Sequence, residues 1–164
     1  MFREMRRKKQ ALSASACAAV LKRGTAGVLA VLGDGGYPYA VPLSYAYDES
    51  AQKLYFHCAR TGHKLDAIAR HSQVSFCVVD KDQVMPQQYT TYFRSVVVFG
   101  RARVLQDVGQ KRAALELLAA RYAPDDESGR RQEIQRQFDQ LLMVQIDIEH
   151  ITGKEAIELV EARP

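Results

Sequence analysis

The sequence predicts a mainly β fold of the α+β class, an antiparallel sheet or small barrel with helices packed outside it. Six segments have the apolar or alternating pattern of strands, and about four have the period of helices. The first strands follow one another through tight turns, and the helices are not interleaved one per strand. This order argues against a doubly wound parallel sheet. A chain of 164 residues is long enough for one domain with a sizeable core.

The N-terminal elements are a helix and a hairpin. Residues 10–24 form an alanine-rich helical segment, and Ser13 is suited to cap it. Residues 25–32 (TAGVLAVL) are an apolar strand. The following GDGG, residues 33–36, is a strong turn signal that predicts an antiparallel return.

The return strand spans residues 37–47 (YPYAVPLSYAY), which are rich in aromatic and β-branched side chains, and it holds Pro42 near its centre. Because proline cannot donate to a ladder, Pro42 marks a sheet edge or a bulge. A ligand lying along that edge and a plain irregular edge strand both account for it.

In the middle of the chain the period changes twice. Residues 54–58 (LYFHC) form a third strand, and residues 61–64 open a helical stretch. Residues 74–79 (VSFCVV) predict a fourth strand, and the polar residues 80–91 predict a loop.

The C-terminal part predicts two strands around a pair of helices. The fifth strand is long enough to bend at Gly100. The last strand alternates apolar and polar residues with period 2. The four elements are residues 94–105, about 108–122, about 129–141, and a last strand that alternates over residues 144–149 and ends near residues 151–154.

The net charge of +4 is confined to the N-terminus. Residues 1–9 hold five basic residues and one acidic residue, so the remaining chain is neutral. We expect a basic flexible tail, residues 1–9, and a single domain, residues 10–164. A neutral body predicts no nucleic-acid binding; binding through the tail is the alternative, and it would weaken steeply with salt.

Composition also indicates the cellular setting. With 47% hydrophobic and 26% charged residues the chain should fold, and it has no apolar run of about 18 residues. We therefore expect no membrane partner. The N-terminus is too charged for a signal peptide, and Cys17, Cys58 and Cys77 form no CxxC pair, so we expect free buried thiols and a cytoplasmic location.

The richest candidate site is the segment of residues 56–64 (FHCARTGHK), a strand end, a turn and a helix start. A helix N-terminus attracts phosphate, Thr61 offers a hydroxyl, Gly62 permits close approach, and Lys64 supplies a charge. No Walker A pattern is present. From the spacing alone, an ordinary helix cap with two solvated cations explains the segment slightly better.

Other site chemistries have little support in the sequence. The four histidines show no metal-ligand spacing, so we expect no metal site. No serine lies in a GxSxG motif, and neighbouring strand positions point His57 and Cys58 to opposite faces. The catalytic residues therefore stay unknown.

The order of these features resembles the nitroimidazole-resistance (Nim)-like group of the pyridoxamine 5′-phosphate oxidase-related superfamily of flavin-binding split barrels. The resemblance runs from about residue 10 to residue 158. Its most specific part is YFHCARTGHK, and VPLSYAYD and ITGKEA strengthen it. It implies a six-stranded antiparallel split β-barrel with peripheral helices, paired into a homodimer with FMN at the subunit interface.

The resemblance also implies the cofactor-binding residues. One group runs beside the isoalloxazine ring, a second surrounds the ribityl chain and the 5′-phosphate, and a third approaches the flavin from the other subunit. They are, in that order, Val41, Pro42, Leu43 and Ser44; His57, Ala59, Thr61, Gly62, His63 and Lys64; and Tyr92, Arg94 and Ser95. FAD and haem are the alternative cofactors.

The implied activity is reduction of a nitro-aromatic or similar small acceptor with electrons from a nicotinamide donor. A flavin-binding storage or sensor protein without turnover is the alternative. Vitamin B6 oxidation is disfavoured, because that activity is associated with arginine-rich motifs near the C-terminus and this chain has only Arg163 there.

Overall fold

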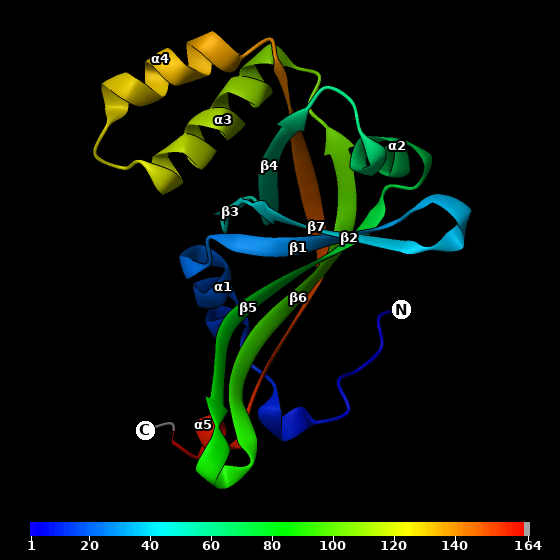
Figure 1. Ribbon diagram of the computed structural model, residues 1–164, viewed down its shortest axis with the longest axis vertical. Coiled ribbons are helices and arrows are strands. Elements are labelled where there is room, and N and C mark those ends of the chain that lie inside the picture. Colours follow the sequence, from blue (N-terminus) through cyan, green and yellow to red (C-terminus); the bar gives the residue numbers. More distant parts are fainter. Residues whose placement is uncertain (163–164) are drawn as a thin grey trace.

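The computed structural model describes residues 1–162, which form one antiparallel sheet of seven strands with helices around it (Figure 1). Residues 163 and 164, Arg163 among them, lie outside the described residues. The strand order is β2-β1-β5-β6-β7-β4-β3. The strands are β1 (Ala26–Leu32), β2 (Pro38–Ser44), β3 (Ala46–Asp48), β4 (Lys53–Ala59), β5 (Gln73–Met85), β6 (Thr90–Val104) and β7 (Leu141–Glu155).

Five α-helices and three short 3-10 turns complete the described part of the chain. The helices are α1 (Ala14–Arg23), α2 (His63–Arg70), α3 (Val108–Tyr122), α4 (Glu127–Gln137) and α5 (Ile157–Glu161), and the turns are Lys8–Gln10, Asp34–Gly36 and Pro86–Gln88. The predicted mainly β class with an antiparallel sheet and outer helices is confirmed. Among residues 1–162, no helix is both long enough and apolar enough to cross a membrane.

The predicted count of six strands is wrong, because the return strand predicted at residues 37–47 is divided at Tyr45. Its first part, β2, pairs with β1, and its last part, β3, pairs with β4. At the break, the Tyr45 backbone N–H donates to the hydroxyl of Tyr122 at 3.0 Å, and the Tyr45 hydroxyl donates to the Leu21 carbonyl at 2.8 Å. Side-chain partners thus replace the ladder at this residue.

The break at Tyr45 also curls the sheet. Strands β2 and β3 are the two ends of the strand order, yet one residue joins them. Since consecutive Cα atoms are about 3.8 Å apart, the two edges must meet there. No ladder joins β2 to β3 in residues 1–162, so the sheet is barrel-like but not closed.

The polar loop predicted at residues 80–91 is also wrong. Strand β5 continues through it to Met85, and pairing with β6 resumes after a register shift between Val79 and Lys81. Residues 80–95, here called the extension, form a long hairpin that projects from the barrel-like part (Figure 1). The composition indicated a loop because both faces of a projecting hairpin can carry polar side chains while the ladder satisfies its backbone.

The helix predictions are correct where a capping residue or a clear period defines the helix. Ser13 caps α1 by accepting from the Ala16 N–H at 3.2 Å, so this helix begins at Ala14 and not at residue 10 as predicted, and α3 has the predicted bounds. The helix predicted at residues 129–141 begins earlier, where Asp126 caps it, and ends earlier, because β7 starts at Leu141. The predicted bend at Gly100 is confirmed as a register shift between β6 and β7.

Two hydrophobic cores lie on opposite sides of the sheet. The inner core includes Phe56 and Phe76 and is covered by α1 and α2. The outer core, with Leu115 and Met143 among its members, lies between α3, α4 and the outer face of β3, β4 and β7. The α3–α4 hairpin is therefore held against that face by apolar packing, which is the arrangement that shapes the candidate site.

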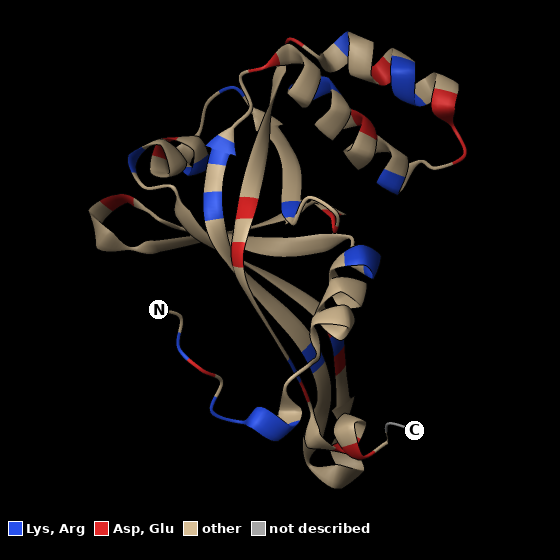
Figure 2. Cartoon of the chain, turned by 180° about the vertical axis from the view of Figure 1, so that it is seen from behind, with Lys and Arg blue, Asp and Glu red and all other residues tan. Residues whose placement is uncertain are grey.

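The N-terminal segment carries the excess charge, as Figure 2 shows by its run of basic residues. The ring of Phe2 stacks on that of His150 with centroids 4.5 Å apart, and Ala11 forms a bridge with Lys154. The flexibility expected of residues 1–9 stays a prediction.

Of the three free cysteines, Cys17 and Cys58 are buried as expected, and Cys77 is half-buried.

Candidate functional site

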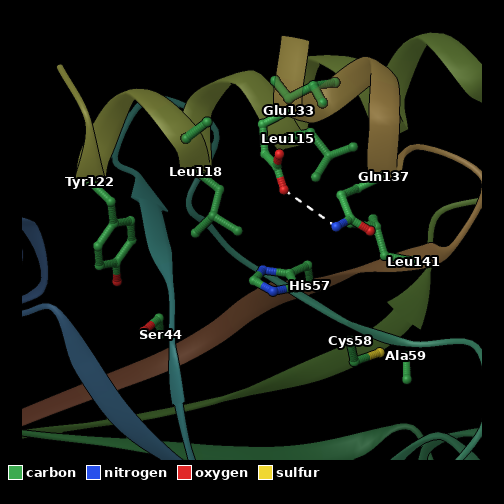
Figure 3. A pocket seen from close by; sticks show the side chains of 12 residues that line it. Ser44, His57, Cys58, Ala59, Leu115, Leu118, Tyr122, Glu133, Gln137 and Leu141 are labelled. Carbon is green, nitrogen blue, oxygen red and sulfur yellow. Dashed lines mark hydrogen bonds between the residues drawn. The ribbon is translucent and has the colours of Figure 1, made fainter. Parts of the chain in front are cut away.

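A cavity of about 480 Å³ lies between β4 and the α3–α4 hairpin (Figure 3). One wall is made by strand residues, and the opposite wall is made by the two helices. The strand wall consists of Ser44, His57, Cys58, Ala59 and Leu141; the helical wall consists of Leu115, Leu118, Ala119, Tyr122, Glu133, Ile134 and Gln137.

Strand alternation on β4 places His57 and Ala59 in the cavity. Both are exposed on the outer face, whereas Phe56 is buried in the inner core. Their partners on β7 are Met143 and Leu141. No hydrogen bond or ion pair with another described residue engages the imidazole of His57, so both ring nitrogens are available to a ligand.

The four residues predicted beside the flavin ring divide between two faces of β2. Val41 and Leu43 pack against the inner core, and Pro42 and Ser44 lie on the exposed outer face. Strand β2 is at one end of the strand order, so the sequence interpretation of Pro42 as an edge residue is confirmed. Of the four, Ser44 lines the cavity.

The start of α2 has the features of an anion site. Gly62 is the N-cap, with φ of 143°, a conformation that glycine adopts readily, and it has no side chain to cap the first turn. Thr61 is exposed beside it. The first backbone N–H groups of the helix are therefore directed outward without a side-chain acceptor.

Lys64, at the start of α2, lies near the end of β4. Burial raises the pKa of the Cys58 thiol, and the positive charge of Lys64 partly offsets that rise. Lys64 itself does not line the cavity, and its charge acts on the end of β4. Of the second predicted group, His57 and Ala59 line the cavity, and Thr61, Gly62, His63 and Lys64 do not.

His63 has partners outside the cavity. Its ring stacks on that of Tyr39 with centroids 4.2 Å apart, and its Nε2 accepts from the Asp34 backbone N–H at 3.3 Å. Arg70, at the other end of α2, donates to the Asp34 carboxylate at 2.5 Å. The two hydrogen bonds to Asp34 fasten α2 to the turn between β1 and β2, and the ring stacking fastens it to β2.

Tyr92, Arg94 and Ser95 do not line this cavity. They lie on the extension, toward the opposite end of the molecule from β4 and α2 (Figure 1). Arg94 donates to Asp80 at 3.2 Å and to Glu155 at 2.7 Å, and Tyr92 donates to Gln88 at 2.8 Å. One chain by itself does not bring them to the other ten predicted residues.

Sequence reasoning missed the helical wall. Its residues have an ordinary helical period, and nothing in their spacing indicates chemistry. The hydroxyl of Tyr122 holds this wall in place, since it accepts from the Tyr45 N–H and can donate to the carbonyl of Tyr45 or Thr25. A tyrosine at the last position of an otherwise regular helix was the one available signal.

A carboxylate faces His57 across the cavity. Figure 3 shows Glu133 and Gln137 projecting from α4 toward His57, with the Gln137 amide donating to Glu133 at 3.3 Å. Arg136 also donates to Glu133, at 2.6 and 2.9 Å, and holds the pKa of that carboxyl below its usual range. The part of the chain that the structure describes gathers no group of three or more His, Cys, Asp or Glu suited to a metal.

Comparison with known proteins adds the family. The pyridoxamine 5′-phosphate oxidase family model matches residues 13–155. No protein of curated function matches the chain. Among solved structures, an FAD-binding protein from Mesorhizobium loti is 30% identical, with a TM-score of 0.66 over 90% of this chain and 97% of that one.

Two further structures share the fold. A candidate 5-nitroimidazole antibiotic resistance protein from Bacteroides thetaiotaomicron is 19% identical, with a TM-score of 0.74 over 88% of this chain and 86% of that one. An FAD- and haem-binding protein from Mycobacterium smegmatis is 21% identical, with a TM-score of 0.74 over 95% of this chain and 80% of that one.

Proposed function

The chain belongs to the pyridoxamine 5′-phosphate oxidase family, and from that premise we propose that it is a flavin-dependent oxidoreductase that binds FMN. Its acceptor is a nitro-aromatic or similar small molecule, and its electron donor is a reduced nicotinamide. The proposal draws on the resemblance to the Nim-like group and on the FAD-binding relative from Mesorhizobium loti.

The observation that carries the proposal is an apolar cavity whose strand residues His57 and Ala59 are followed, three residues further along the chain, by the uncapped start of α2 at Gly62. A flat ring system needs apolar walls and a few polar groups, and a phosphate monoester needs donors and positive charge. Leu115, Leu118 and Ile134 supply the apolar wall of the cavity. The uncapped N-terminus of α2 supplies the donors for the phosphate, and Lys64 supplies the positive charge. The residues present therefore fit a flavin mononucleotide.

Each group of residues has a distinct task in this proposal. Lys64, Thr61 and the first N–H groups of α2 bind the phosphate. His57 and Ala59 lie along the ribityl chain, and the β2 backbone from Val41 to Ser44 borders the ring. The apolar helical wall excludes water from the reacting face.

Bound flavin would supply the redox chemistry, taking two electrons from the nicotinamide and passing them to the acceptor. A nitro group that receives two electrons and two protons becomes a nitroso group and releases water. The chain's contribution is position and the exclusion of water.

We further propose a homodimer in which the partner's extension brings its Tyr92, Arg94 and Ser95 toward the flavin. An exposed apolar row supports this pairing: the outer face of the sheet aligns Pro42, Val28, Cys77 and Val97 across four strands. Val28 is 39% exposed in the single chain. Such a face marks an interaction surface, and sedimentation equilibrium should give twice the mass of 18.4 kDa.

The direct test is the visible spectrum of the purified protein and its titration with flavins. We expect flavin absorption and a Kd for FMN well below that for riboflavin, which lacks the phosphate. Lys64→Gln should weaken FMN binding about tenfold and leave riboflavin binding unchanged. Lys53→Gln, a lysine at the far end of β4, is the matched control and should bind both flavins normally.

A protein that takes up no FMN at micromolar concentration would overturn the proposal. Steady-state oxidation of NADH or NADPH with a nitro-aromatic acceptor tests turnover. Flavin bound without turnover over a broad panel would favour a storage or sensor role, and a Soret band would favour haem.

A further inference from the structure

The strand wall of the cavity has an expected ligand, and the helical wall has none. The resemblance assigns Ser44, His57 and Ala59, on the strand wall, to the flavin. Nothing assigns the helical wall of α3 and α4. A planar ring that lies against strand backbone has its other face toward the helices, across a cavity of about 480 Å³.

We propose that the helical wall is the binding surface for the second substrate, and that Glu133 makes it select flat aromatic molecules that are neutral or cationic over anionic ones. The proposal rests on the proposed function, because it takes the strand wall as occupied by the flavin. The apolar part of the wall, Leu115, Leu118 and Ile134, suits the face of an aromatic ring.

The expected selection against anions follows because only the acidic member of the Glu133–Arg136 ion pair lines the cavity. Glu133 and Gln137 line it, and Arg136, which neutralises Glu133, does not. Among the described residues, no Lys or Arg is part of the cavity lining. The Lys111 ammonium is held by the Phe138 and Leu141 carbonyls and is not part of the lining, and Lys64 faces the proposed flavin phosphate.

The Glu133 carboxylate can still accept a hydrogen bond from a ligand. A carboxylate offers about four lone-pair sites. Three hydrogen bonds reach the two oxygens: two from Arg136, at 2.6 and 2.9 Å, and one from Gln137, at 3.3 Å. The Glu133 side chain is also 57% exposed, so an incoming donor group can reach it.

Gln137 is the second recognition group. Its amide nitrogen donates to Glu133, so its carbonyl oxygen is the atom that can accept from a ligand. Together the two side chains present acceptors, and they favour a substrate whose polar substituent is an amine, an amide N–H or a hydroxyl.

The experiment uses three para-substituted nitrobenzenes of similar shape: 4-nitrobenzylamine, 4-nitrobenzyl alcohol and 4-nitrobenzoate, which are cationic, neutral and anionic at pH 7. Calorimetric titration of the FMN-loaded protein without donor gives the Kd of each. We expect the amine to bind at least tenfold more tightly than the carboxylate. In steady state, kcat/KM should follow the same order.

Glu133→Gln should reduce that tenfold preference to threefold or less and leave the Kd for FMN unchanged. The matched control is Glu127→Gln. Glu127 lies on the same helix in a similar pair with Arg131 but does not line this cavity, so its variant should keep the full preference.

Three results would overturn the inference. They are equal affinity of the wild type for the three compounds, an undiminished preference in Glu133→Gln, and a loss of FMN affinity in that variant, which would place Glu133 against the cofactor. A wild-type protein that takes up no FMN overturns the proposed function itself, and that outcome is separate from these three.

Discussion

The extension and the cavity end treat their polar groups in opposite ways. In the extension, Asp80 is paired with both Arg23 and Arg94, and Arg94 also pairs with Glu155. In the cavity end, the imidazole of His57 has no partner among the described residues and faces an apolar space. Charges that the chain pairs internally hold the fold, whereas polar groups directed into an apolar cavity can still bind a ligand.

The carboxylates of the extension depend on their arginine partners for stability, whereas the carboxylate at the cavity does not. The Asp80 and Glu155 side chains are 8% and 2% exposed, so their charges need the arginines to remain buried. The Glu133 side chain at the cavity is 57% exposed and needs no such compensation. Substitutions in the extension should therefore change stability, and substitutions at the cavity should change binding.

The largest effect should come from the joint between the two regions. Gly100 lies on β6 five residues beyond the extension, at the register shift between β6 and β7, and a Cβ there would meet the Asp147 backbone oxygen and lie 2.9 Å from Ile146 Cγ2. Gly100→Ala should lower the free energy of unfolding by about 3 kcal/mol, because backbone cannot move aside cheaply. Urea denaturation measures this, and a change below about 0.5 kcal/mol would show that the two regions join less rigidly.

The next effect should come from the ion pairs of the extension. Asp80→Asn should cost about 2 kcal/mol at pH 7, because it leaves Arg23 without its buried counter-charge and leaves Arg94 with Glu155 alone. Asp82→Asn, an exposed neighbour on the same strand, should cost less than about 0.5 kcal/mol. Equal stability of the two variants would contradict the contrast between the regions.

The same carboxylate predicts a pH dependence. Hydrogen bonds from Arg23, followed by the charges of Arg23 and Arg94, hold the pKa of Asp80 below its ordinary value of 3.8, although burial opposes this. A lowered pKa in the folded state stabilises the fold above pH 3.8, and this stability is lost as the pH falls through the lowered pKa. The difference between wild type and Asp80→Asn should therefore be full at pH 7 and shrink below about pH 4.

A smaller effect is expected where the helical wall is fastened to the sheet. Tyr122→Phe removes the hydroxyl that accepts from the Tyr45 N–H at 3.0 Å and should cost about 1 kcal/mol. Tyr89→Phe, at a side chain that is 98% exposed, is the control and should change nothing measurable. If Tyr122→Phe also left the free energy of unfolding unchanged, the helical wall would be held to the sheet by apolar packing alone.

The smallest effect on stability should be that of Glu133→Gln. Its ion pair with Arg136 is exposed and local, at i,i+3 on one helix, so the free energy of unfolding should change by less than about 0.5 kcal/mol. Thermal denaturation beside the binding measurements checks this. A loss as large as that of Asp80→Asn would make the cavity carboxylate structural and remove the distinction between the two regions.

The sequence by itself determined the class of fold, most of the elements and part of the site. Period and capping residues are local signals, so α1 with its cap Ser13, the helix at residues 108–122 and the bend at Gly100 were all predictable. The strand end and helix start of residues 56–64 were predictable for the same reason, because their chemistry is contiguous in the chain.

The tertiary structure decided what depends on partners distant in sequence. Tyr45 divides a strand because Tyr122, 77 residues away, binds its backbone. The polar residues after Val79 form a strand because β6 pairs with them. Glu133 faces His57 because α3 and α4 pack on the outer face of β4, and no local pattern contains that contact. Local propensity specifies elements, but long-range packing specifies which side chains share a cavity.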